Sequence, residues 1–172
     1  MTATVRFQRI AFIDLEASGL GSASFPTEIG WAIIREDGSI DSASFLIRPP
    51  SKWTVYENAW SPASEQLTGI TREMLEQNGL PPAEVMTRFL QAVGDQELFS
   101  DAPDFDGHWL GMLAYAAGTS LGARTIGDAT TLVGKLSAER DFGGELPPAR
   151  HRAEPDARRL ALAFACKAQD RE

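Results

Sequence analysis

Residues 10–20 read Ile-Ala-Phe-Ile-Asp-Leu-Glu-Ala-Ser-Gly-Leu, and this stretch decides the fold. It opens with four apolar residues, a pattern that is typical of a strand buried on both faces. Asp14 and Glu16 follow, and the two-residue period of a strand places both carboxylates on the same side. Two carboxylates so near to each other repel unless a proton or a cation lies between them. A hard divalent cation such as Mg²⁺, which takes oxygen ligands, is the natural partner.

The composition indicates an acidic globular protein. The chain has 172 residues, 43% of them apolar, and a net charge of −8, so we expect a single domain over residues 1–172. This charge argues against a broad basic surface for long duplex nucleic acid, but it permits a site that binds a short strand end. We find no charged-then-apolar leader and no apolar run near the about 20 residues that a membrane span needs. We therefore expect a cytoplasmic protein with no membrane contact, and we expect its single cysteine, Cys166, to be buried.

The order of the predicted elements indicates an α/β protein. Residues 27–34 and 40–47 are rich in β-forming residues and flank a turn at Asp37-Gly38, which predicts three successive antiparallel strands with residues 10–14. Helix starts are expected at Ser61-Pro62 and at Thr71. Residues 95–106 hold five acids and no base, a pattern typical of a solvated loop. We expect a short strand at residues 124–126, a helix from about residue 128 and a loop at residues 143–148.

Two further acids stand at predicted helix starts. Asp106 lies in the first turn of a mid-chain helix, where the helix dipole favours an anion. Asp156 lies in the first turn of a last helix, which we expect to begin near Glu154-Pro155 with Pro155 as its first residue. His151 stands five residues before Asp156, within the only basic concentration of the chain, at residues 150–159. Phosphate is the natural target of such an arginine group.

Two stretches have open interpretations. Glu28 lies at the start of the second predicted strand and could either approach the acidic residues or remain a solvated strand end. The loop at residues 49–62 contains Trp53, Tyr56 and Trp60. These aromatic side chains could stack on nucleic-acid bases or cap the core.

The chain resembles the DEDDh exonucleases, the ribonuclease H-like 3′-to-5′ exonucleases that include proofreading subunits, ribonuclease T and oligoribonuclease. Residues 12–20 closely match the first motif of that family, and residues 151–156, His-Arg-Ala-Glu-Pro-Asp, match its His-x-x-x-x-Asp motif. Residues 67–71, Leu-Thr-Gly-Ile-Thr, resemble its His-Gly-Ile-Thr segment. The family's second motif is often His-Asn-Ala-x-Phe-Asp, where this chain has Ser-Asp-Ala-Pro-Asp-Phe-Asp at residues 100–106. The chain therefore has one extra residue and Asp101 in place of the asparagine; we expect Asp106 to be the motif's ligand, with Asp104 as the alternative.

The resemblance implies a ribonuclease H-like mixed sheet, three antiparallel strands followed by parallel strands, flanked by helices. It also implies a metal-dependent 3′-to-5′ exonuclease that releases mononucleotides from the 3′ ends of single-stranded RNA or DNA, with two divalent ions, Mg²⁺ or Mn²⁺. Asp14 would bridge both ions, Glu16 and Asp156 would complete one site, and Asp106 would hold the other.

The resemblance also assigns roles to residues outside the metal site. His151 would deprotonate the attacking water. The segment Ala17, Ser18, Gly19 and Leu20 would line the 3′-terminal nucleotide, with Leu20 wedged against a base. Similar ribonucleases are often dimers, so a homodimer is expected by analogy alone.

Three alternatives remain. A catalytically weak module of the same fold that binds strand ends is supported by the altered second motif. A structural metal-binding domain would leave His151 and its neighbouring arginines unexplained. A nuclease that cuts internally is opposed by the motif that joins His151 to Asp156. The sequence leaves the choice between RNA and DNA open.

Overall fold

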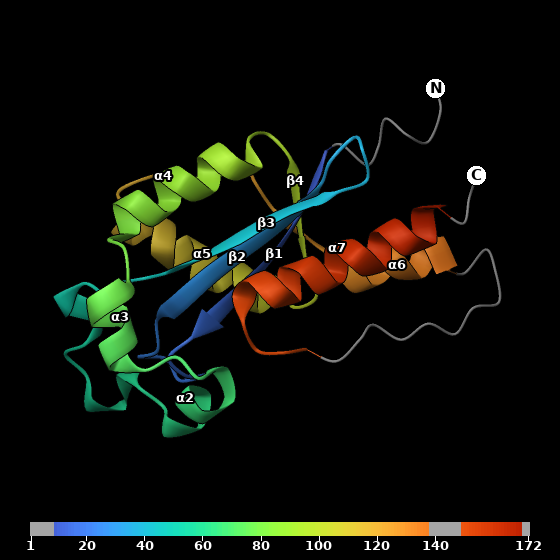
Figure 1. Ribbon diagram of the computed structural model, residues 1–172. Coiled ribbons are helices and arrows are strands. Elements are labelled where there is room, and N and C mark those ends of the chain that lie inside the picture. The colour runs from blue at the N-terminus through green and yellow to red at the C-terminus, as the bar shows by residue number, and fades with distance from the viewer. Residues whose placement is uncertain (1–8, 138–148, 170–172) are drawn as a thin grey trace.

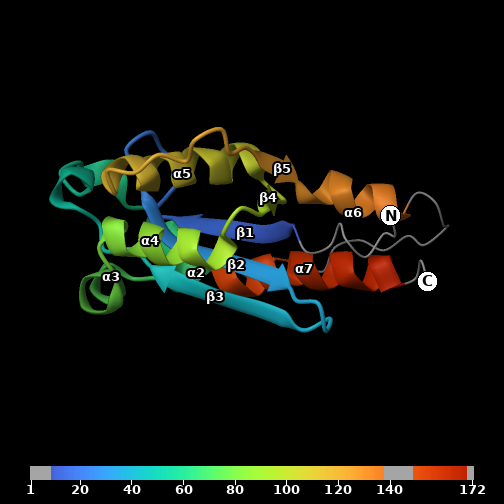
Figure 2. The ribbon, with the colours of Figure 1, turned by 90° about the horizontal axis from the view of Figure 1, so that it is seen from above.

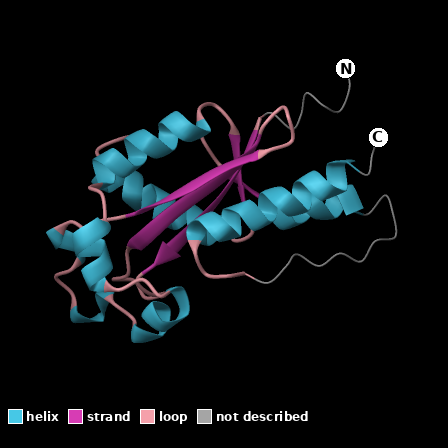
Figure 3. Cartoon of the chain, in the orientation of Figure 1, coloured by secondary structure: helices cyan, strands magenta, loops and turns pink. Residues whose placement is uncertain are grey.

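The computed structural model describes residues 9–137 and 149–169, and it shows a five-stranded mixed sheet with helices on both faces (Figures 1 and 3). The strand order is β3-β2-β1-β4-β5, so that β1 is central. β1 pairs antiparallel with β2, which pairs antiparallel with β3, and the pairs β1–β4 and β4–β5 are parallel. The expected mixed sheet is therefore confirmed. The strands are β1 (Ile10–Ala17), β2 (Pro26–Ile34), β3 (Ile40–Leu46), β4 (Glu97–Ser100) and β5 (Ile126–Asp128).

Helices form a layer on each face of the sheet. The long helix α7 (Ala153–Gln169) packs on β1, β2 and β3, and α6 (Ala129–Ser137) lies beside it (Figure 2). The helices α4 (Pro82–Val93) and α5 (Pro103–Ala116) pack against each other and against β1 and β2. Two separate clusters of buried apolar side chains result. The sheet is therefore covered on both faces, which explains why β1 carries apolar side chains on both of its faces.

The alternation of side chains along β1 decides which face carries the acids. Ala11, Ile13 and Leu15 belong to the core that α4 and α5 cover. Ile10 and Phe12 belong to the core under α7, where the ring of Phe12 lies 5.4 Å from that of Phe164. Because successive side chains alternate between the two faces, Asp14 and Glu16 lie on the same face as Phe12, which is the face that α7 covers.

Short helices connect β3 to α4, and their starts confirm the sequence-based predictions. The hydroxyl of Ser61 accepts a hydrogen bond from the Ser64 N–H at the start of α2 (Pro62–Thr68). The hydroxyl of Thr71 accepts one from the Met74 N–H at the start of α3 (Arg72–Asn78). Gly69 lies between the two helices with a positive φ of 70°, a conformation that glycine adopts without strain. Two 3₁₀ turns, Ser51–Trp53 and Glu57–Ala59, precede them.

Several predicted boundaries were wrong. The acidic stretch at residues 95–106 contains the strand β4, whose Leu98 is buried against the core. The last short strand occupies residues 126–128 instead of 124–126. The helix expected from about residue 128 is confirmed: α6 begins at Ala129, and the carboxylate of Asp128 accepts the N–H groups of Thr130 and Thr131.

The last helix also begins earlier than predicted. α7 starts at Ala153, so Pro155 is its third residue. That position is tolerated because the first four N–H groups of a helix lack intrahelical partners. Cys166 is exposed and not buried, and the loop expected at residues 143–148 lies outside the described residues. Within the described ranges, no helix has both the length and the apolarity of a membrane span.

Candidate functional site

Acidic side chains from three elements converge on Asp14, near the carboxyl end of the central strand. Asp14, Glu16 and Asp156 each present a carboxylate oxygen, and these oxygens lie within 4.8 Å of one another. Asp14 also belongs to a second such group, with Asp101 and Asp106. The structure thus brings together all four acids that the sequence singled out, and it adds Asp101. Carboxylate oxygens are the ligands that hard divalent cations prefer.

Asp106 reaches this cluster from the first turn of α5. The β1–β4 pairing ends at Phe12 and Phe99, and beyond it the Leu15 N–H donates to Oδ1 of Asp106 at 2.9 Å. The Asp106 carboxylate therefore accepts a backbone N–H of β1 beyond the point where β4 stops pairing with that strand. Asp106 is only 2% exposed, and its Oδ2 atom has no hydrogen-bond partner among the described residues. Asp104, the alternative ligand, is exposed and outside both groups.

Asp156 organises the turn before α7. Its carboxylate accepts the backbone N–H of Arg150 at 2.8 Å and that of Arg152 at 3.2 Å. The intervening residue, His151, has a positive φ of 56° and an exposed side chain. The two hydrogen bonds therefore fix the backbone on both sides of His151, next to Asp156. His151 itself belongs to neither carboxylate group.

Glu28 is an additional buried acid beside the cluster. It lies opposite Glu16 in the β1–β2 ladder, but it is ion-paired with Arg152, and it also accepts the Ala153 N–H and the Ser44 hydroxyl. Burial alone would raise the pKa of Glu28, but these hydrogen bonds hold that pKa below its ordinary value. Of the two interpretations, the structure excludes a solvated strand end. Glu28 joins β2 to the start of α7.

The carboxylates of the cluster have strongly perturbed acidities. Burial, followed by the negative charges of Asp106 and Glu16, raises the pKa of Asp14 to about 10. Burial and the charge of Glu28 raise the pKa of Glu16 to about 7. Burial also raises the pKa of Asp106 to about 7, against the opposing effects of the nearby Ser100 side chain and of the Leu15 N–H. Without a cation, protons must therefore offset part of the negative charge.

The segment from Ala17 to Leu20 lies directly after the acids. A bulge between Glu16 and Ala17 ends the regular ladder. Ser18 is buried, and its hydroxyl donates to the Ala59 carbonyl at 2.6 Å and accepts the Phe25 N–H at 3.0 Å. Leu20, in contrast, is 84% exposed. The structure thus uses Ser18 as an anchor and presents Leu20 to solvent.

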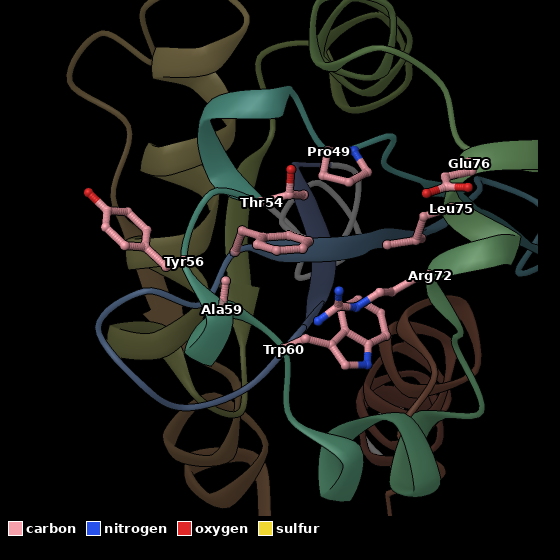
Figure 4. A pocket seen from close by; sticks show the side chains of 9 residues that line it. Pro49, Thr54, Tyr56, Ala59, Trp60, Arg72, Leu75 and Glu76 are labelled. Atoms are coloured by element: carbon pink, nitrogen blue, oxygen red, sulfur yellow. The ribbon is translucent and has the colours of Figure 1, made fainter.

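Behind this anchor lies a cavity of about 280 Å³, lined by aromatic and charged side chains (Figure 4). The guanidinium of Arg72 stands over the Trp60 ring, 5.2 Å from its centroid. Tyr56 and Glu76 lie on opposite sides of the cavity. Trp53 is buried and stacked on Phe25, so it caps the core, whereas Tyr56 is exposed. Capping of the core is thus observed for Trp53, and stacking on a base stays a prediction for the exposed Tyr56.

Three ion pairs of the site were not found from the sequence. Arg159 binds both Asp101 and Asp156, and Arg152 binds Glu28. The sequence did single out some of these residues: Asp101 replaces the asparagine of the related motif, and both arginines belong to the basic segment at residues 150–159. The pairing itself depends on the tertiary structure, because the ion-paired residues Arg152 and Glu28 are 124 residues apart in the chain.

Comparison with solved structures identifies exonucleases of similar fold. The chain superposes on Exonuclease I of E. coli in a complex with single-stranded DNA and zinc, with a TM-score of 0.70, 17% identity and 95% of this chain covered. It superposes on the nuclease domain of 3′hExo, a DEDDh family member bound to rAMP, with a TM-score of 0.69 and 15% identity over 95% of this chain and 93% of that one. A full-length 3′-exonuclease gives a TM-score of 0.71 and 16% identity, with 95% of this chain and 61% of that chain covered.

These similarities confirm the ribonuclease H-like fold and, at the level of the fold, the resemblance to the DEDDh exonucleases. The chain spans 41% of the length of the E. coli Exonuclease I chain. No family model and no curated protein sequence matched the chain.

Proposed function

We propose that this chain is a metal-dependent 3′-to-5′ exonuclease domain that releases mononucleotides from single-stranded nucleic acid. The observation that carries the proposal is the convergence of Glu16, Asp156 and Asp106 on Asp14. This arrangement combines three separate elements, and it occurs on the fold that exonucleases share. The related Exonuclease I structure contains single-stranded DNA, which supports a single strand as the substrate.

The residues of the cluster fit two divalent cations, Mg²⁺ or Mn²⁺. All donors are carboxylate oxygens, and Asp14 belongs to both groups. The buried, unpartnered Oδ2 of Asp106 supports a ligand in the second group, since buried polar atoms normally have partners. When bound, such ions would stabilise charge on the attacking and leaving oxygens of an in-line displacement. Glu16 and Asp156 would complete one site with Asp14, and Asp106 would hold the other.

His151 is the proposed general base. Its side chain is exposed, so water and substrate can reach it, and its backbone is fixed beside Asp156 by the hydrogen bonds of its two neighbours. A neutral imidazole in that place accepts the proton of the attacking water. Arg150, an exposed residue on one side of His151, is suited to a phosphate group of the strand.

The 3′-terminal nucleotide would lie along Ala17, Ser18, Gly19 and Leu20. Two hydrogen bonds of its hydroxyl anchor Ser18, and the exposed Leu20 offers an apolar surface to a base. An anchored segment positions the terminal phosphodiester without further ordering. The net charge of −8 supports recognition of a short strand end over binding of a long duplex.

A second candidate is a module of the same fold that binds strand ends but cleaves them weakly. It is favoured by one observation, the replacement of the second motif's asparagine by Asp101, which alters the charge of the cluster.

The test uses oligonucleotides labelled at the 5′ or the 3′ end, in Mn²⁺ or in EDTA. We expect a ladder of 5′-labelled products that shortens by one nucleotide at a time, no cleavage in EDTA or with Asp14→Asn, and slower cleavage when the 3′-hydroxyl is blocked. Binding without cleavage by the wild type would favour the binding module. Internal cuts or release from the 5′ end would contradict the proposal.

A further inference from the structure

We propose that Asp101 is a fifth carboxylate of the cation site, which completes the second group with Asp14 and Asp106 and is oriented by Arg159. This inference rests on the proposed metal dependence, and it adds a ligand that the related motif, with an asparagine at this position, does not supply. Asp101 lies just after β4, on the turn that leads into α5.

The first support is the geometry of the second group. An oxygen of Asp101 lies within 4.8 Å of an oxygen of Asp14 and one of Asp106. Asp106 is 2% exposed, and its Oδ2 atom has no partner among the described residues. A buried carboxylate oxygen without a donor is energetically unfavourable. A cation bound by this group would offset the negative charge of the buried Asp106 carboxylate.

The second support is the way Arg159 holds Asp101. The Nη2 atom of Arg159 lies 2.5 Å from Oδ2 of Asp101, and the Nε atom of Arg159 lies 3.3 Å from Oδ1 of Asp156. The Arg159 side chain is 9% exposed, and a guanidinium this deeply buried requires carboxylate partners. Because a carboxylate has two oxygens with several lone pairs, Asp101 can bind Arg159 and still offer a ligand atom to a cation.

Arg159 therefore connects the two groups of the site. It touches Asp101 in one group and Asp156 in the other. Asp101 also adds a carboxylate charge beside Asp14 and Asp106. An asparagine at this position would bring no negative charge to pair with Arg159 or with the second cation.

The test counts bound Mn²⁺ in the purified full chain, by isothermal titration and by electron paramagnetic resonance of the free ion. For wild type we expect two Mn²⁺ ions. For Asp101→Asn, which keeps the shape of the side chain, we expect the weaker ion to bind at least about tenfold less tightly and the tighter ion to bind as in wild type. Asp104→Asn is the matched control, because Asp104 is an exposed acid in the first turn of α5. This variant should bind both ions with wild-type affinity.

Arg159→Gln separates a ligand from a structural brace. If Asp101 is a ligand, loss of its competing cation should leave the weaker Mn²⁺ bound as tightly as in wild type, or more tightly. If Asp101 only ties the β4–α5 turn to α7, both variants should lower the melting temperature and Asp101→Asn should bind two ions with wild-type affinity, which would overturn the inference. If Asp101→Asn fails to fold, Arg159→Gln alone provides the test. Weaker binding of both ions by that variant would overturn the inference that Asp101 is a ligand.

The outcome is also separable from that of the proposed function. A wild-type protein that binds two Mn²⁺ ions but degrades no oligonucleotide would refute the exonuclease proposal, while the effect of Asp101→Asn on the second ion would still stand. Conversely, an active wild type whose Asp101→Asn variant binds both ions normally would refute only the fifth ligand.

Discussion

Arg152 holds Glu28 with two parallel hydrogen bonds, from Nε to Oε2 and from Nη2 to Oε1, both 2.9 Å long. Glu28 also accepts the Ala153 N–H at 3.1 Å. These bonds join β2 to the first residue of α7, between the two positions that the proposed mechanism needs, His151 and Asp156. The bidentate geometry fixes direction as well as distance. The ion pair is therefore a positioning device for the C-terminal half of the site.

Arg152→Ala tests this role through stability. The substitution leaves the Glu28 carboxylate buried with fewer donors, so we expect the free energy of unfolding in urea to fall by about 1.5–3 kcal/mol, the range for hydrogen bonds to charged groups. Arg35→Ala is the control, because Arg35 pairs with Asp41 where both side chains are largely exposed, and such a pair contributes about 0–1 kcal/mol. Equal losses in the two variants would contradict the positioning role.

Gly30→Ala tests the close approach of α7 to the sheet. A Cβ atom at Gly30 would lie 2.3 Å from the Ala153 carbonyl carbon and 2.5 Å from the Glu154 nitrogen, and both are backbone atoms. We expect α7 to shift, with a loss of about 1–3 kcal/mol from overpacking. The rise in melting temperature caused by Mn²⁺ should shrink too, because Gly30 lies opposite Asp14 in the ladder and α7 carries Asp156.

The matched control for that substitution is Gly111→Ala in α5, where no atom of another element lies within 4 Å of the added Cβ. Alanine is a better helix former than glycine by up to about 1 kcal/mol, so this variant should be as stable as wild type or more stable. An unchanged response to Mn²⁺ in Gly30→Ala would show that the approach of α7 does not set the cation site.

The central strand was predictable because its four-residue apolar run and its two spaced acids obey local rules, and β1 lies where the pattern placed it. Ser61 and Thr71 were predictable as helix caps for the same reason. The strand β4 was missed because it has only four residues, is flanked by acids and forms through parallel pairing with β1 and β5. Its stability comes from neighbours distant in sequence, which a local charge pattern does not reveal.

The acids of the site were predictable as a set, because each one stands at the end of a strand or the start of a helix. Their supporting contacts were not. The pairs Arg159–Asp101 and Arg152–Glu28 join residues 58 and 124 positions apart, so only the folded chain brings them together. Asp101 was visible as a departure from the related motif, but its place beside Asp14 depends on how β4 ends.

The metal-free protein should lose stability as the pH rises from 5 to 8. Burial raises the pKa of Glu16 and of Asp106 to about 7, from ordinary values of 4.5 and 3.8. The folded state thus holds protons that the unfolded chain has released, so their contribution is full below about pH 4 and is lost as the pH passes 7. Within this window each such carboxyl lowers the free energy of unfolding by about 1.4 kcal/mol per pH unit.

Thermal unfolding in EDTA at several pH values measures this trend. Glu16→Gln should flatten the curve, because it removes one titrating group. Mn²⁺ should raise the melting temperature most at high pH, since a cation binds the ionised carboxylates. Glu28, whose pKa is lowered, favours the opposite trend only near and below its ordinary value of 4.5. A melting temperature in EDTA that rises between pH 5 and 8 would contradict the cause assigned here.

His151 provides the sharpest distinction between an exonuclease and a binding module. His151→Asn is the variant of choice, because asparagine also adopts the left-handed backbone that the φ of 56° requires, while its amide cannot accept the proton. We expect Mn²⁺ binding and strand-end binding to persist and kcat to fall by roughly 10²–10⁴-fold, the usual contribution of a positioned acid or base. The loss should appear in kcat more than in KM, since the imidazole acts on water in the transition state.

The dependence of the rate on pH then identifies the titrating group. The wild-type rate should rise with pH, because only the neutral imidazole accepts a proton, and this rise should disappear in His151→Asn. The comparison is needed because a cation-bound water also loses a proton as the pH rises. His151→Gly serves as a second variant, in which the positive φ is free of strain, so a defect shared by both variants arises from the lost imidazole and not from the backbone. If both variants cleave at the wild-type rate with the same profile, His151 is only an exposed turn residue, and the base must be sought among the carboxylates.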